Sequence, residues 1–256
     1  MRIVIKIGTS TITHKTGMLN IKRMESLCKV LSDIKNSGTE LILVSSGAIG
    51  MGVGKLHFKE RPKDTATKQA AASVGQCELM YTYDKLFSEY NHTVSQILVT
   101  AEDIEDKKRL INFQNTVNRL LELDVLPIIN ENDTVSVDEL SIGDNDTLSA
   151  IVAKSIHADL LVLLSDIDGL YTADPRKDPN AKRIDVVSEI TEEIEKMSEG
   201  KGSDLAIGGM KTKINAAKIV TEAGTDMIIA NGSNIENLNT LVNGTLDGTR
   251  FIGKRD

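Results

Sequence analysis

Short apolar runs alternate with longer helical patterns along this chain, and that rhythm constrains the fold more than any other feature. The runs are rich in Leu and β-branched residues, and they cover residues 3–7, 41–44, 97–99, 125–129, 160–164 and 227–230. Runs of this kind are typical of strands that are buried on both faces of a parallel sheet. The patterns between them predict helices over residues 21–36, 65–90, 107–123, 147–157 and 210–223. The sequence therefore predicts an α/β protein with one doubly wound, mostly parallel sheet sandwiched by helices.

Two segments interrupt this alternation. Residues 132–143 alternate apolar and polar side chains around Asp138 and Glu139, which predicts a β-hairpin inserted beside the sheet. Residues 171–187 contain Asp-Pro twice, so we expect an irregular loop with a second hairpin there. No repeat, linker or shift in composition marks a boundary, and we expect a single domain over residues 1–256. The pattern leaves the order of the strands open.

Composition and charge exclude several classes of function. The chain has 256 residues, an apolar fraction of 40% and a formal net charge of −7, and its basic residues are scattered. A nucleic-acid surface needs concentrated positive charge and stacking aromatics, whereas aromatic residues make up 3% of this chain and Trp is absent. Cys28 and Cys77 form no CxxC pair, and no apolar run has the length of a membrane span. We therefore expect a soluble cytoplasmic protein that binds neither nucleic acid nor membrane.

Polar residues follow several of the predicted strands directly. Ligands of open α/β sheets bind at the carboxyl ends of the strands, so these residues are the first candidates for a site. They are Lys6 and residues 8–10 at the first strand, residues 45–47 after the second, residues 130–133 after the fourth, and Ser165 with Asp166 after the fifth. Small, amide and acidic side chains at the ends of four strands exceed what loops alone require.

The first glycine-rich segment, residues 47–54, has the spacing GxxGxGxG. A dinucleotide-binding loop needs GxGxxG and an acidic residue after the next strand, so the segment does not predict such a site. For Gly52 and Gly54 we expect a flexible turn between strand and helix. Gly47 differs, because a Cβ atom there would crowd a ligand bound against the Ser46 amide.

The second glycine-rich segment, residues 207–213, opens the last predicted helix and is not a Walker A loop. Backbone amides at a helix start bind anions, and the helix dipole is positive there. Lys211 and Lys213 add positive charge at that end, which is locally unfavourable unless an anion is present. Capping alone would be served better by an acidic residue. The segment therefore indicates a phosphate-binding turn.

Lys6 lies inside an otherwise apolar strand, so its side chain is either at an exposed edge or directed into a site. A second lysine at a glycine-rich helix start favours the site, because phosphoryl transfer needs cations around the transferring oxygens. Residues 143–146 read Gly-Asp-Asn-Asp at another helix start, where a single residue would suffice as a cap. We interpret Asp166 as facing the site, and Asp168 with Gly169 as a turn.

Taken in order, these segments resemble the amino acid kinase family over residues 1–253. The segments are KIGTS at 6–10, VSSGAI at 44–49, INEND at 129–133, GDND at 143–146, GLYTADP at 169–175 and GGMKTK at 208–213. The segment at 169–175 is similar to aspartokinases and uridylate kinases as well, so it supports only the family. The segments at 129–133 and 143–146, and the single glycine in KIGTS, are similar to the members that phosphorylate free glutamate.

The resemblance implies that Lys6 and Lys213 are catalytic and that ATP is used with Mg²⁺ carried by the nucleotide. It implies that L-glutamate is bound mainly by the N-terminal part of the domain, through Ser46, Gly47, Asp133, Asp144, Asn145 and Asp146. It places ATP mainly in the C-terminal part, at Lys6, Gly8, Ser165, Asp166, Ile207, Gly208, Gly209, Met210, Lys211, Thr212 and Lys213. The product would be γ-glutamyl phosphate, the first intermediate of proline synthesis, with proline as feedback inhibitor and a homo-oligomer (dimer or tetramer) as the assembly.

Two departures from the family pattern bear on these expectations. Ile207 stands where many members have a threonine, so any contact from that hydroxyl is lost while backbone contacts can remain. Many members carry a C-terminal PUA domain, and we expect a short form without one. Two alternatives stay open at this point. The substrate could be N-acetylglutamate, aspartate or a uridylate, or the chain could be a non-catalytic amino-acid sensor, against which both lysines argue.

Overall fold

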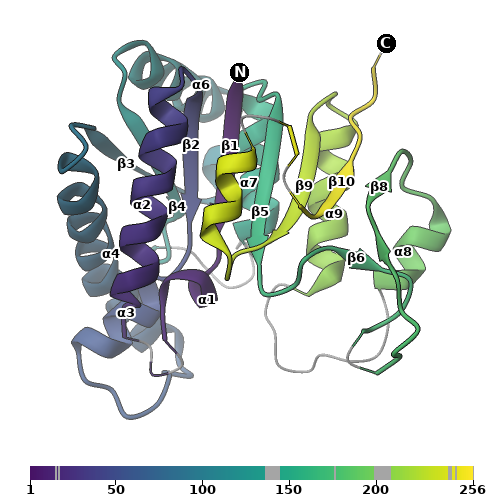
Figure 1. The fold of residues 1–256 in the computed structure, drawn as a ribbon. Helices are drawn as coiled ribbons and strands as arrows, with labels where there is room; N and C mark the ends of the chain where they lie inside the picture. Colours follow the sequence, from purple (N-terminus) through teal and green to yellow (C-terminus); the bar gives the residue numbers. More distant parts are fainter. Residues whose placement is uncertain are drawn as a thin grey trace.

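An eight-stranded sheet forms the centre of the protein, with the strand order β3-β4-β2-β1-β5-β9-β10-β8 (Figure 1). The computed structural model describes residues 1–14, 16, 18–135, 145–175, 177–198, 209–241, 244–245 and 247–255. The strands are β1 (Arg2–Ile7), β2 (Glu40–Ser45), β3 (Val94–Val99), β4 (Leu126–Glu131), β5 (Leu160–Ser165), β8 (Val186–Val187), β9 (Asp226–Asn231) and β10 (Thr249–Phe251). Neighbouring strands are parallel except β9 and β10, which are antiparallel. The predicted doubly wound, mostly parallel sheet is confirmed.

Helices cover both faces of this sheet (Figure 1). They are α1 (Thr9–Ile12), α2 (Ile21–Asn36), α3 (Ala48–Lys55), α4 (Thr65–Ser88), α5 (Ala101–Glu105), α6 (Lys107–Glu122), α7 (Asn145–Ser155), α8 (Glu192–Ser198), α9 (Met210–Thr221) and the 3₁₀ helix η1 (Ile235–Thr240). The apolar side chains of α2, α4 and η1 pack in one core cluster, and those of α6, α7 and α9 pack in a second. Among the helices described, none is long and apolar enough to cross a membrane.

The alternation of side chains along β1 decides where Lys6 points. Ile3, Ile5 and Ile7 belong to the core cluster of α2 and α4, whereas Val4 belongs to the cluster of α7 and α9. Successive side chains of a strand point to opposite faces of the sheet. Lys6 shares the parity of Val4, so its side chain leaves the sheet on the face that α7 and α9 cover.

The two segments that interrupt the alternation have different outcomes. Strands β6 (Leu170–Tyr171) and β7 (Arg183–Ile184) pair antiparallel in a sheet of their own, which confirms the hairpin expected within residues 171–187. The hairpin expected over residues 132–143 falls largely outside the described residues. Of that segment the structure describes residues 132–135, which form a turn after β4.

The expectation of a flexible turn at Gly52 and Gly54 is wrong, because both residues lie inside α3. A Cβ atom on Gly52 would overlap the carbonyl oxygen of Ala71 in α4, and one on Gly75 would overlap the carbonyl oxygen of Ala48 in α3. These glycines allow the two helix backbones to approach closely. Gly47 precedes α3 with φ +111°, a left-handed conformation that glycine adopts without strain.

Candidate active site

A buried carboxylate joins the two candidate lysines at the carboxyl edge of the sheet. Asp146 Oδ1 lies 2.7 Å from Lys6 Nζ, and Asp146 Oδ2 lies 2.9 Å from Lys213 Nζ. The Lys6 contact is a close ion pair whose angles fall short of a well-formed hydrogen bond. Thr212 Oγ1 also donates to Asp146 Oδ2, at 3.0 Å. We call these four residues, which come from β1, α7 and the start of α9, the lysine–aspartate cluster.

The lysine–aspartate cluster is largely buried and contains two ammonium groups and one carboxylate. The Asp146 side chain is 1% exposed and that of Lys213 is 6% exposed. Burial alone would raise the pKa of Asp146, but the charges of Lys6 and Lys213 hold it below its usual range. Among the described members of the cluster, two ammonium groups share one buried carboxylate. Paired cations of this kind suit the binding of an anion.

The start of α9 adds to that attraction. Its first turn carries no acidic residue, and Gly209 supplies no side-chain cap within the described part of the chain. The Thr212 N–H donates to the Gly209 carbonyl oxygen at 3.1 Å, whereas the N–H groups of Met210 and Lys211 have no acceptor among the described residues and suit an anion. Together with the two lysines of the cluster, they fit the phosphates of a nucleotide.

The two lysines of the glycine-rich segment have different surroundings. Lys211 is exposed to solvent, whereas Lys213 is buried. The unfavourable positive charge at the helix start is met in part by Asp146, which comes from α7. Asp146 was predicted among the substrate-binding residues, and the structure places its carboxylate in contact with both lysines.

A second set of contacts links Ser46, Asn130, Asn145 and Gln76, which we call the amide network. Asn145 Nδ2 lies 2.7 Å from Ser46 Oγ, 3.0 Å from Asn130 Oδ1 and 3.3 Å from the Ser45 carbonyl oxygen. Asn130 Nδ2 in turn donates to Gln76 Oε1 at 2.9 Å. The structure thus brings together the predicted residues Ser46 and Asn145, which follow β2 and open α7.

The first two residues of α7 connect the two sets of contacts. Asn145 belongs to the amide network, and Asp146 belongs to the lysine–aspartate cluster. Because consecutive residues of a helix point in different directions, the start of α7 contributes one side chain to each set of contacts.

Asp133 lies just after β4, partly buried, in the turn that follows the strand. Burial and, to a smaller extent, the negative charge of Glu131 raise the pKa of Asp133 to about 6 against the opposing effect of Arg61. No described lysine or arginine forms an ion pair with it. A carboxylate in this state would be stabilised by a cationic group of a ligand.

The remaining predicted residues have fewer contacts in the structure. Gly8 precedes α1 as its N-cap residue and lies close to Lys6, where a Cβ atom would come to 3.6 Å from Lys6 Nζ, an ordinary contact distance. Ser165 Oγ donates to Asp166 Oδ1 at 3.1 Å at the end of β5, and within the described chain neither residue contacts the two sets above. Met210 begins α9. Asp144, Ile207 and Gly208 lie outside the described residues.

Sequence reasoning missed the roles of two residues in these contacts. Asn130 was noted only as one of several polar residues after its strand, and its amide is now at the centre of a network. Gln76 lies in the middle of a predicted helix, where nothing in the local pattern distinguished it. Both side chains are buried. The one available sequence signal for Gln76 was that it is a polar residue in a helix expected to pack on the sheet.

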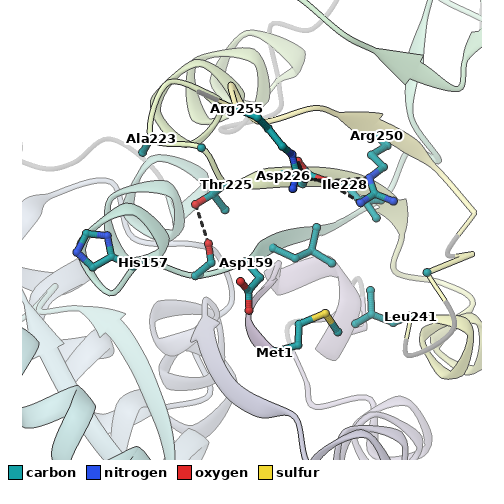
Figure 2. A pocket seen from close by; sticks show the side chains of 14 residues that line it. Met1, His157, Asp159, Ala223, Thr225, Asp226, Ile228, Leu241, Arg250 and Arg255 are labelled. Carbon is teal, nitrogen blue, oxygen red and sulfur yellow. Dashed lines mark hydrogen bonds and ion pairs between the residues drawn. The ribbon is translucent and has the colours of Figure 1, made fainter.

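A cavity of about 350 Å³ lies elsewhere, at the amino ends of β1, β5 and β9 (Figure 2). Asp226 accepts from Arg250 Nη2 at 2.6 Å and from Arg255 Nη2 at 3.2 Å in its wall. These guanidinium groups are already neutralised in part by Asp226. Because parallel strands share one direction, this cavity is at the edge of the sheet opposite to Lys6 and Asn145.

An open parallel sheet with paired lysines and a glycine-bounded helix start at its carboxyl edge defines a class of phosphoryl-transfer enzymes. The model of the amino acid kinase family matches residues 1–231, and the chain belongs to this family. It is 54% identical over 253 residues to glutamate 5-kinase of Clostridium acetobutylicum, covering 99% of this chain and 95% of that relative. It is 50% identical over 258 residues to glutamate 5-kinase of Clostridium perfringens, covering 99% of this chain and 96% of that relative.

A solved structure agrees with the fold. Carbamate kinase from Giardia lamblia, bound to AMP-PNP, matches with a TM-score of 0.70 at 16% sequence identity. The match covers 99% of this chain and 98% of the other. At that identity the likeness shows a shared fold.

Proposed function

We propose that this chain transfers the γ-phosphoryl group of ATP to the side-chain carboxylate of L-glutamate, which forms γ-glutamyl phosphate, the first step of proline synthesis. One observation carries the proposal: a buried cluster in which two lysines share one carboxylate is linked to an amide network, and a single helix start contributes to both. Half of the residues are shared with relatives named glutamate 5-kinase, which identifies the acceptor.

The acceptor carboxylate needs no activation by a base. A glutamate side chain has a pKa of about 4.3, so it is already ionised and nucleophilic at neutral pH. The task of the protein is to hold the two substrates in line and to neutralise charge as the phosphoryl group moves. Lys6 and Lys213 supply that charge, and Asp146 holds both ammonium groups in place. Mg²⁺, carried by ATP, adds further charge neutralisation when it is bound.

We assign the substrate groups to the predicted residues as follows. Ser46, Asn145 and the charge of Asp133 bind the α-carboxylate and α-ammonium groups of glutamate, and Gly47 and Asp144 shape the pocket. Gly8, Ser165, Asp166 and residues 207–213 line the ATP site. In this arrangement the N-terminal part of the domain holds mainly glutamate and the C-terminal part holds mainly ATP.

Regulation and assembly extend the same proposal. Proline shares an α-carboxylate and an α-nitrogen with glutamate, so a pocket that binds those groups can also bind proline. We propose proline as a feedback inhibitor on this ground. From the family resemblance we also propose a homo-oligomer, a dimer or a tetramer, and a cytoplasmic location, where the free thiols of Cys28 and Cys77 stay reduced.

Turnover of ATP with and without L-glutamate tests the function directly. Hydroxylamine in the assay traps an acyl phosphate as a hydroxamate, so hydroxamate formation should require both ATP and L-glutamate. N-acetylglutamate, aspartate and UMP serve as the competing acceptors. Faster turnover with any of these three would contradict the assignment of glutamate, and ATP binding without turnover on any acceptor would identify a sensor.

The raised pKa of Asp133 predicts a pH dependence of glutamate use. The carboxyl group is ionised above about pH 6 and becomes neutral as the pH falls through that value. The neutral form no longer attracts the α-ammonium group, so kcat/KM for glutamate should fall with decreasing pH and reach about one tenth of its plateau at about pH 5. Glutamate itself keeps its charges over most of this range.

The matched control is Asp133→Asn, which should have a low kcat/KM for glutamate at every pH. The protonation of ATP changes with pH in the same way for the wild type and for Asp133→Asn. Dividing the wild-type pH profile of kcat/KM by that of the variant therefore leaves the effect of Asp133 ionisation. If the ratio stays constant between about pH 5 and pH 8, Asp133 does not bind the ammonium group through its charge.

A further inference from the structure

We infer that Gln76 is a positioning residue for the glutamate site: its side-chain oxygen accepts from the Asn130 amide and, together with the backbone N–H of Glu131, holds the orientation on which the hydrogen bonds of Asn145 and Ser46 depend. The inference rests on the proposed function, because it concerns how the same site recognises glutamate. Gln76 lies in α4, is 7% exposed and contacts no part of the lysine–aspartate cluster in the described structure.

The orientation of the Asn130 amide is set by the main chain. The backbone N–H of Glu131 donates to the side-chain oxygen of Asn130 at 2.9 Å. A backbone N–H can only donate, so Oδ1 must be the atom on that side. The Nδ2 group of Asn130 then has to face Gln76, whose Oε1 accepts from it at 2.9 Å. Gln76 Oε1 is the acceptor that the described chain offers to this Nδ2 group, so it supports the orientation that the Glu131 N–H sets.

The orientation of the Asn130 amide determines how the side chains of Asn145 and Ser46 are oriented. Asn145 Nδ2 faces Asn130 Oδ1 and the backbone oxygen of Ser45, and both of these can only accept. Asn145 Oδ1 is therefore turned away from the network, and no described residue donates to it. The two hydrogens of Asn145 Nδ2 serve three acceptors, so one hydrogen is shared; Ser46 Oγ, at 2.7 Å the nearest of the three, accepts and keeps its own proton free to be donated. The site thus presents one acceptor, suited to an ammonium group, and one donor, suited to a carboxylate.

The cost of keeping an amide at position 76 supports this role. Gln76 Nε2 is buried and has no hydrogen-bond partner among the described residues. A buried donor without a partner destabilises the fold, and an apolar side chain of similar size would remove that penalty. Packing between α4 and the sheet therefore does not explain a glutamine here, whereas the need for an acceptor opposite Asn130 does.

Gln76→Met tests the inference, with Gln114→Met as the matched control. Gln114 lies in α6, and its Nε2 donates to the Ser155 carbonyl oxygen at 2.7 Å, at the far end of α7 from Asn145. We expect Gln76→Met to raise the glutamate KM about tenfold, the scale of one lost buried hydrogen bond, and to change the ATP KM and kcat by less than about twofold. Gln114→Met should leave the glutamate KM unchanged.

A double-mutant cycle separates positioning from a general structural effect. If Gln76 acts through Asn130, then adding Gln76→Met to Asn130→Ala should raise the glutamate KM by less than about twofold. A full tenfold rise in that background would overturn the inference, as would a Gln76→Met variant that matches Gln114→Met. Gln76→Leu replaces Gln76→Met in the cycle if the latter does not fold. A wild-type chain that forms no product from glutamate would overturn the proposed function, which is a separate result.

Discussion

We expect Lys213→Ala to lower kcat by roughly 100-fold or more, the scale of a lost cation at developing transition-state charge. Lys213 is buried, and its ammonium group lies 2.9 Å from Asp146 at the start of α9. The phosphoryl group of ATP carries the charge that this lysine meets, so the glutamate KM should change much less than kcat. Lys6→Ala should act in the same way, because Lys6 contacts the other oxygen of the same carboxylate. Steady-state kinetics with each substrate varied in turn measures both effects.

The matched control for this prediction lies on the same helix. Lys218 pairs with Glu195 at the surface, where an ion pair contributes little and no substrate is expected. Lys218→Ala should therefore keep kcat within about twofold of the wild-type value. Near-normal turnover in Lys213→Ala would contradict the assignment of this lysine to the transferring phosphoryl group.

Asp146→Ala is expected to reduce the free energy of unfolding by about 3–5 kcal/mol, the usual cost of removing one partner from a buried ion pair. The substitution leaves the ammonium groups of Lys6 and Lys213 close together without the carboxylate that holds them. Because burial and like charge then disfavour both cations, kcat should also fall. Urea unfolding measures the first effect and steady-state kinetics the second.

A surface carboxylate provides the comparison for the unfolding measurement. Glu122 pairs with Arg119 at the end of α6, and both side chains are largely exposed. Glu122→Ala should change the free energy of unfolding by no more than about 0.5 kcal/mol. Equal losses in the Asp146 and Glu122 variants would show that the lysine–aspartate cluster is solvated and does not behave as a buried ion pair.

Much of the fold could be predicted because its signals are local. Helix α2 begins and ends at the predicted residues, and its start is marked by Asn20, whose side chain accepts from the backbone N–H of Arg23. Buried parallel strands leave a continuous apolar run in the sequence, which is why β1, β2 and β5 were located correctly. The candidate site residues could be proposed for a related reason, since polar residues that end parallel strands collect at one edge.

The short elements could not be predicted in the same way. Helix α3 carries glycines at positions that normally weaken a helix, and its stability depends on packing against α4. Whether a glycine serves a turn or a close helix contact depends on a partner distant in sequence, here Ala71 for Gly52. A local pattern contains no information about that partner.

The sequence by itself determined the class of fold, the limits of the long helices and strands, and the residue types from which the site is built. Only the tertiary structure decided the strand order and the partners within the site. Asp146 joins the two lysines because β1 directs Lys6 to the face that α7 and α9 cover. Gln76 reaches Asn130 because α4 packs on the other face. Side-chain direction in a strand follows from parity, but which helix covers each face is settled by the packing of the whole chain.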